Sequence, residues 1–206
     1  MPRPPILPVS FYSRGTLDVA RDLIGKLLVH RTPAGIAAGL IVETEAYIGE
    51  EDPACHAAKG RTPRNAPLYG PPGLAYVYLS YGVHPLVNAV TERDGFPAAV
   101  LIRALEPVDG LPLMRRRRRR SPWRKGKPEV ADHALCRGPG NLSVALGISL
   151  AENLAPLGGP ALTIEDHGRD AGPVGWTSRI GISAGQDKLW RCAVIGHRAV
   201  SARPAR

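Results

Sequence analysis

Two carboxylates lie two residues apart in the apolar segment Ile41–Tyr47. In an extended strand alternate side chains share a face, so Glu43, Glu45 and Tyr47 point the same way. Charged groups in an apolar strand cost free energy unless they are paired or used. The pattern therefore fits either the polar face of an edge strand or a general base beside an aromatic ring.

A second group of chemically useful side chains lies in the segment Leu74–Gly82, which contains three of the six tyrosines. Tyr76 and Tyr78 share one face of the expected strand, whereas Tyr81 has the opposite parity and stands next to Gly82, where a strand would end. Aromatic side chains on a strand pack across the sheet or stack on nucleobases, and both uses stay open here.

A single arginine, Arg103, closes the apolar segment Ala98–Ile102. An arginine in this position often pairs with a buried acid, and Glu45 and Glu43 are the candidates. The sequence has neither an H-x-E nor a P-C-x-x-C motif, which excludes a zinc deaminase, and its three cysteines form no C-x-x-C pair. We therefore expect no metal, no cofactor and no disulfide framework.

The chain is strongly basic, with 27 Lys and Arg against 18 Asp and Glu, a net charge of +9. This excess favours a polyanionic partner, because lysine and arginine docked on phosphates release condensed counterions. Six consecutive arginines, Arg115–Arg120, begin a basic loop expected over 115–127. Like charges at this density favour a solvated segment, which is either a mobile loop or the exposed tail of a helix. The functional alternative is a non-specific phosphate-binding arm, in which Trp123 stacks or packs. A non-catalytic basic nucleic-acid-binding protein is thus the alternative to an enzyme.

The elements that must position these residues mix helical and extended patterns within one domain of 206 residues. The expected helices cover 16–28, with a stop at Gly25, and short segments at 132–135 and 142–146. The expected strands cover 39–46, 75–81, 88–91, 98–105, 161–165, 179–182 and 190–195. The segment 49–73 is rich in turn residues, and flexible ends are expected at 1–9 and 197–206.

The N-terminal prolines interrupt any signal-peptide core, and no apolar run approaches the length of a membrane span. We therefore expect a cytoplasmic protein that makes no use of a membrane.

Several separate motifs occur in one order over roughly residues 10–196. They are IVETEAY (41–47), RTPRN (61–65), YVYLSYG (76–82), VLIRALEP (100–107), GPG (138–140) and RIG (179–181). In these motifs the chain resembles the alkyladenine DNA glycosylases, also called 3-methyladenine or methylpurine DNA glycosylases. The resemblance implies an α+β fold, a single-domain mixed fold around a curved antiparallel β-sheet with flanking helices. It also implies that the protein binds double-stranded DNA as a monomer, excises alkylated or deaminated purines and leaves an abasic site.

The resemblance assigns roles residue by residue. Glu45 corresponds to the general base that activates water, and Arg103 and the backbone carbonyl of Ile180 correspond to the partners that hold this water. The walls of the base pocket correspond to Tyr47, His56 and Tyr78, and Asn88 to the group that excludes the 2-amino group of guanine. Tyr81 corresponds to the wedge that fills the duplex, and the stretch near the DNA backbone corresponds to Arg61, Thr62 and Arg64.

The chain departs from the family pattern beside the Gly-Pro-Gly turn, where Asn141 replaces the usual lysine and removes one expected phosphate contact. The arginine run Arg115–Arg120 could offset this loss. Toward the pocket rim, His84–Leu86 and Cys192 replace bulkier aromatic or sulfur-containing residues. With Glu45 as the base, Glu43 is expected to support the site by pairing with a basic group.

Overall fold

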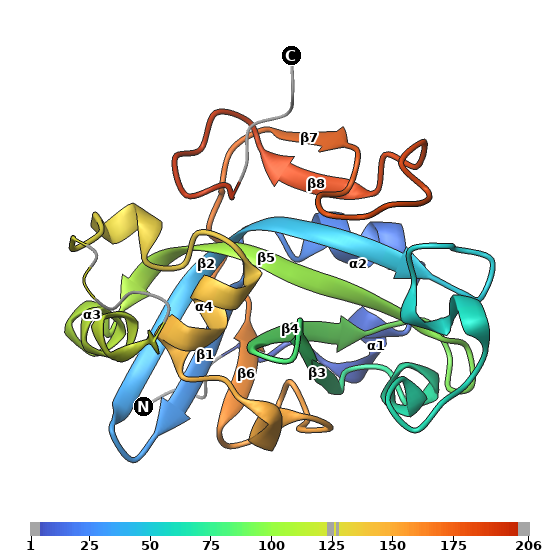
Figure 1. The fold of residues 1–206 in the computed structure, drawn as a ribbon, viewed down its shortest axis with the longest axis horizontal. Helices are drawn as coiled ribbons and strands as arrows, with labels where there is room; N and C mark the ends of the chain where they lie inside the picture. Colours follow the sequence, from blue (N-terminus) through green and yellow to red (C-terminus); the bar gives the residue numbers. More distant parts are fainter. Residues whose placement is uncertain (1–4, 123–125, 127, 202–206) are drawn as a thin grey trace.

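An antiparallel sheet of eight strands organises the chain (Figure 1). The computed structural model describes residues 5–122, 126 and 128–201. Six strands follow one another in the order β3-β4-β5-β2-β1-β6, and β8 pairs with both β2 and β7. The strands are β1 (Leu27–Thr32), β2 (Gly35–Ile48), β3 (Ala75–Ser80), β4 (His84–Val90), β5 (Ala98–Asp109), β6 (Leu162–Glu165), β7 (Val174–Thr177) and β8 (Arg191–Val194). The expected fold, an α+β domain around a curved antiparallel sheet, is confirmed.

The long central strand β2 carries the candidate carboxylates because it is paired along almost its whole length. It pairs with β1 in its first half, with β5 throughout, and with β8 at Glu43–Glu45. Its register against β5 shifts around Glu43, which bends the strand where the carboxylates lie. At Gly39 a Cβ atom would stand 2.7 Å from the Cβ of Leu105, so only glycine allows the two strands to approach here.

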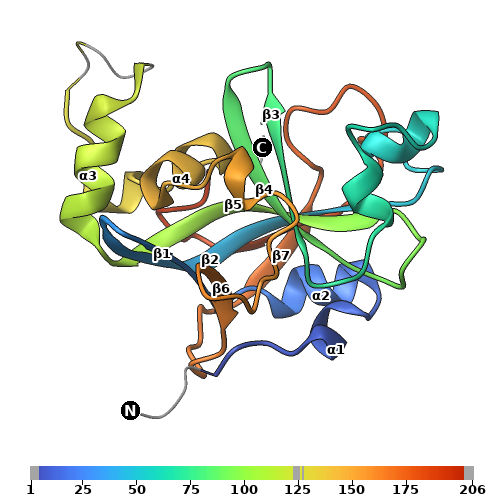
Figure 2. The same ribbon diagram turned by 90° about the horizontal axis from the view of Figure 1, so that it is seen from below.

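Helices cover both faces of the sheet (Figure 2). The first two, α1 (Val9–Tyr12) and α2 (Thr16–Asp22), lie on one side, where Val19, Ala20 and Leu23 are buried. On the other side lie α3 (Leu111–Arg120) and α4 (Pro139–Leu146), together with the projecting β3–β4 hairpin. Within the described residues, no helix is long and apolar enough to cross a membrane.

Short 3-10 helices replace longer elements elsewhere: η1 (His56–Lys59), η2 (Ala66–Tyr69), η4 (Asp132–Ala134) and η5 (Leu150–Glu152). The first two lie in the segment 49–73, in agreement with its many turn residues. The helix expected over 16–28 is too long, because it ends at Asp22 and Leu27 already belongs to β1. The strand expected over 179–182 is absent, and β7 was not expected.

The arginine run Arg115–Arg120 forms the second half of α3, so of the two structures left open for it the tail of a helix is correct and the loop is wrong over these residues. Trp123 lies outside the described residues. Within the ends that were expected to be flexible, the described residues Leu7 and Ala199 are buried against the fold.

Candidate active site

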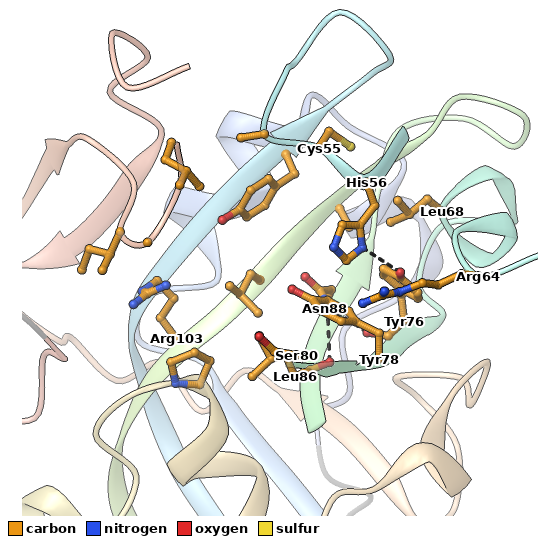
Figure 3. A pocket seen from close by; sticks show the side chains of 18 of the residues that line it. Cys55, His56, Arg64, Leu68, Tyr76, Tyr78, Ser80, Leu86, Asn88 and Arg103 are labelled. Atoms are coloured by element: carbon orange, nitrogen blue, oxygen red, sulfur yellow. Dashed lines mark hydrogen bonds between the residues drawn. The ribbon is translucent and has the colours of Figure 1, made fainter. Parts of the chain in front are cut away.

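A cavity of about 380 Å³ opens beside β2, β3, β4 and β5, a size typical of small-ligand sites. Residues 54–56 and 180–182, together with Arg64, Leu68, Tyr81 and the first residue of α4, Pro139, complete its lining. Figure 3 shows Arg103 across the cavity from a cluster of rings formed by His56, Tyr76 and Tyr78. Seven of the predicted site residues line it besides Arg103, namely Tyr47, His56, Arg64, Tyr78, Tyr81, Asn88 and Ile180.

Glu45 lies directly behind this lining, completely buried. The Tyr47 hydroxyl (2.8 Å) and Arg103 Nη1 (3.1 Å) both donate to its Oε2. The backbone N–H of Ile180 donates to Oε1 at 2.7 Å. Burial raises the pKa of Glu45 above its ordinary value, while Arg103 and the Ile180 N–H oppose that rise. The carboxylate is therefore oriented by three donors, all from residues that line the cavity.

Glu43 is also buried, but its oxygens are occupied by other groups. Arg191 Nε donates to its Oε1 at 2.6 Å, and Arg103 Nε donates to the same oxygen at 3.2 Å. The Ser201 backbone N–H donates to Oε2 at 2.6 Å. The expected pairing of Glu43 with a basic group is confirmed, and Arg103 bridges the two carboxylates.

The aromatic wall of the cavity is built mainly from β3 and η1. The rings of Tyr76 and Tyr78 stack with centroids 5.2 Å apart, and the His56 ring meets Tyr78 edge-on at 4.4 Å. His56 Nδ1 and the Tyr76 hydroxyl lie 2.9 Å apart. Burial, reinforced by the charge of Arg64, lowers the pKa of His56, so its ring is neutral at pH 7. Tyr76 was not among the predicted pocket residues, although its parity with Tyr78 could have indicated it.

Asn88 and Tyr81 occupy opposite ends of the same hairpin. Asn88 of β4 is 4% exposed and donates from Nδ2 to the backbone carbonyl of Tyr76 at 2.9 Å. Tyr81 stands at the tip between β3 and β4, 91% exposed, in a left-handed conformation with φ of 50°. An exposed aromatic ring at the mouth of a cavity is positioned to contact a large ligand rather than the protein core.

The three residues predicted to lie near the DNA backbone have different surroundings in the structure. Arg64 lines the cavity, donates to the Leu79 carbonyl at 3.1 Å and lies over the Tyr78 ring. Arg61 lies over the ring of Tyr69, outside the cavity lining, and Thr62 is exposed on the same loop.

A buried ion pair behind the cavity was missed by the sequence predictions. Arg179 donates from Nη1 to Asp52 Oδ2 at 2.6 Å and from Nη2 to Oδ1 at 2.7 Å, with both side chains completely buried. Its guanidinium lies between the rings of Tyr47 (4.7 Å) and Trp190 (5.1 Å). The pair thus fixes the backbone just before Ile180, which holds Glu45. The RIG motif pointed to Arg179, but nothing in the sequence singled out Asp52.

The described residues contain no group of three or more His, Cys, Asp or Glu side chains arranged to hold a metal ion. The three cysteines are free and buried, and burial raises the pKa of the Cys55 and Cys192 thiols to about 11. These thiols are therefore protonated near neutral pH and are poor nucleophiles.

A buried, oriented carboxylate behind an aromatic cavity, on a basic chain, is suited to an enzyme that binds a flat, ring-shaped group of a polyanion beside a general base. The chain belongs to the methylpurine-DNA glycosylase family, whose sequence model matches residues 10–198. It is 48% identical to a protein of Methanocella arvoryzae over 91% of both chains. It is 50% identical to a protein of Rubrobacter xylanophilus over 90% of this chain and 91% of the relative. Both relatives have 3-methyladenine DNA glycosylase in their names.

Membership of this family makes the chain a DNA glycosylase that acts on alkylated purines, and thus a hydrolase of N-glycosyl bonds. The family assignment and the buried carboxylate favour an enzyme over a non-catalytic basic binding protein.

Proposed function

We propose that the enzyme rotates an alkylated or deaminated purine out of double-stranded DNA and hydrolyses its N-glycosidic bond with water activated by Glu45. The observation that carries this proposal is the buried Glu45 carboxylate, held by Tyr47, Arg103 and the Ile180 N–H behind a cavity of aromatic rings. The product is an abasic site.

Base binding begins outside the protein. A purine inside a duplex is out of reach, so extrusion costs a few kcal/mol of stacking and pairing, and damaged bases lose less. Tyr81 offsets part of this cost by filling the gap in the duplex. Tyr47, His56 and Tyr78 then enclose the base. A purine alkylated at its 3 or 7 position is cationic and stacks favourably on these rings, and a neutral His56 does not repel it.

For an alkylated, cationic purine the chemical step needs little help with the leaving group, because the base departs as a neutral molecule when the N-glycosidic bond breaks. Attack then occurs at the sugar C1′ through an oxocarbenium-like state, as in glycosidases. Glu45 removes the proton of water and stabilises the positive charge of the sugar. Because Glu45 is completely buried, this water is bound inside the protein. We assign its other partners to Arg103 and the backbone carbonyl of Ile180.

The enzyme is monofunctional in this proposal. No lysine occurs among the residues that line the described cavity, so there is no amine to form a Schiff base with the sugar. The strand is therefore left intact after the base has departed.

We propose that the substrates belong to the class of 3-methyladenine, 7-methylguanine, hypoxanthine and ethenoadenine. The names of the relatives support 3-methyladenine. Asn88 is buried against the base site and is held by the Tyr76 carbonyl, so its amide resists displacement by the 2-amino group of guanine.

On the DNA side, Arg61, Thr62 and Arg64 contact the phosphate backbone, and the enzyme acts as a monomer. We further propose that it works in the cytoplasm, associated with the nucleoid through this binding.

A panel of duplexes, each with one modified purine, tests the proposal by release of the base and formation of an abasic site. Glu45→Gln keeps the shape of the side chain and should bind the same duplexes. Its release of base should fall by about 10²–10⁴-fold, the usual contribution of a general base. Glu51→Gln, an exposed change nearby, is the matched control and should release base normally. Base release by Glu45→Gln at nearly the wild-type rate would refute the mechanism.

A further inference from the structure

The arginine run of α3 divides into two groups with different surroundings. Three of its members are anchored to the protein. Arg115 pairs with Asp132, and Arg118 donates to Asn141 Oδ1. Arg117 donates to the Leu146 carbonyl at 2.6 Å, among other acceptors. These contacts attach the arginine-rich half of α3 to α4 and the segment before it.

The other three members, Arg116, Arg119 and Arg120, are exposed. Their spacing of three and four residues places them on one face of the helix, and we call them the arginine ridge. Like charges at this spacing destabilise an isolated helix, so the ridge persists because Arg115, Arg117 and Arg118 hold it from behind. A set of exposed positive charges that forms no ion pair within the described residues favours an anionic partner.

One member of the ridge, Arg120, lines a groove that reaches the turn of the β3–β4 hairpin. The groove, lined by Val83, Arg117, Arg120 and Val144, runs between the end of α3, α4 and the β3–β4 hairpin. The hairpin abuts α4 closely, since a Cβ at Gly140 would stand 3.2 Å from His84. Val83 is 41% exposed, two residues after Tyr81. The groove therefore places Arg120 of the ridge and Val83 of the hairpin turn along one surface.

The ridge and the loop 61–64 flank the hairpin tip. Figure 2 shows α3 on one side of the projecting hairpin and the segment that contains η1 and η2 on the other, all on the same side of the sheet. A rod-shaped partner that met Tyr81 at its middle would thus meet arginines at both ends.

We propose that the arginine ridge binds the phosphate backbone of duplex DNA beyond the lesion, on the side of the hairpin opposite Arg64. This inference rests on the proposed function, because the position of the lesion follows from the cavity and Tyr81. Duplex DNA is favoured as the partner because α3 lies on the same side of the sheet as the hairpin that carries Tyr81, and Arg120 shares a groove with the hairpin turn. Phosphate contacts carry no sequence information, so the ridge adds affinity without specificity.

The test compares two pairs of substitutions that remove equal charge. Arg116→Gln with Arg120→Gln removes part of the ridge. Arg21→Gln with Arg169→Gln removes two exposed arginines beside α2, on the other side of the sheet. Binding of each protein to a short undamaged duplex is measured by fluorescence anisotropy over a range of salt concentrations.

Each phosphate contact contributes about 0.9 to the slope of log K against log salt. When the salt concentration is raised from about 50 to about 200 mM, the affinity of wild type should therefore fall by a factor about ten times larger than the affinity of the ridge variant does. The Arg21/Arg169 pair should keep the wild-type slope, and Arg116→Lys with Arg120→Lys should restore it. Equal slopes for wild type and the ridge variant would overturn the proposal.

This binding measurement uses no damaged base. Its outcome is therefore separate from a failure of the proposed function, which wild-type enzyme would reveal by releasing no base from any lesion duplex.

Discussion

Removal of the charge of Asp52 should destabilise the protein strongly and impair catalysis from a distance. Asp52 and Arg179 are both completely buried and make two short hydrogen bonds with each other. Burial alone would raise the pKa of Asp52, but the hydrogen bonds from Arg179 and the Ala54 N–H hold it below its ordinary value. The folded state therefore requires the carboxylate to be charged at neutral pH.

In Asp52→Asn the Arg179 guanidinium stays buried without its counterion. Breaking a buried pair in this way costs about 3–5 kcal/mol. For a chain of this length, each kcal/mol lowers Tm by about 2–4 °C, so the expected decrease is roughly 6–20 °C. The rate of base release at saturating enzyme should also fall, because Arg179 fixes the position of Tyr47 and of the Ile180 N–H that holds Glu45.

Thermal unfolding and single-turnover base release are measured on the same samples, with Glu51→Gln as the neighbouring exposed control. A second variant, Asp52→Leu with Arg179→Met, removes both charges and should recover much of the lost stability. It should not recover the rate, because Tyr47 and Ile180 lose the guanidinium that positions them. If Asp52→Asn melts within about 1 °C of wild type, a shift worth less than about 0.5 kcal/mol, the buried pair does not contribute as argued.

Three further predictions concern the reaction itself. Burial raises the pKa of Glu45, and the general base must be deprotonated to act. In a pH–rate profile, kcat/KM for a cationic lesion should therefore fall as the pH decreases, with a midpoint above the ordinary glutamate pKa of 4.5. A midpoint at or below 4.5 would contradict this prediction. Asn88→Gly opens space beside the base and should increase the release of normal guanine, measured as abasic sites in undamaged DNA. If guanine release is unchanged, Asn88 does not exclude the 2-amino group of guanine. Tyr81→Ala should leave Tm unchanged, because the ring is 91% exposed. It should lower base release more when the lesion is stably paired than when it is mismatched, because a mismatched base is easier to extrude. An equal effect on both duplexes would exclude the wedge role of Tyr81.

The sequence predicted the site where the determining geometry is local. Strand alternation correctly placed Glu43, Glu45 and Tyr47 on one side of β2. Arg103 donates to both carboxylates and Tyr47 donates to Glu45, even though the register of β2 against β5 shifts at Glu43. The pattern could not decide which carboxylate is the base. That distinction depends on Arg191 and Ser201, which lie 148 and 158 residues after Glu43.

The failures of the sequence predictions have the same cause. The density of charge in Arg115–Arg120 left a loop and the tail of a helix as alternatives, and the choice depends on Asp132, Asn141 and the Leu146 carbonyl, which hold the segment as a helix. The Asp52–Arg179 pair joins residues 127 positions apart, and no local pattern announces such a pairing. The resemblance to a family indicated Arg179 only as part of a motif, without its partner.

The hydrogen bonds from Ser201 to Glu43 also determine when the active site can be completed during translation. Translation delivers β2 early, but the backbone N–H that caps Glu43 leaves the ribosome 158 residues later. Until then, among the described residues, Glu43 has Arg103 and later Arg191 as its charged partners. The carboxylate network is therefore completed only after residue 201 has been synthesised, and a nascent chain that stops before it lacks the hydrogen bonds from Ser201 to Glu43.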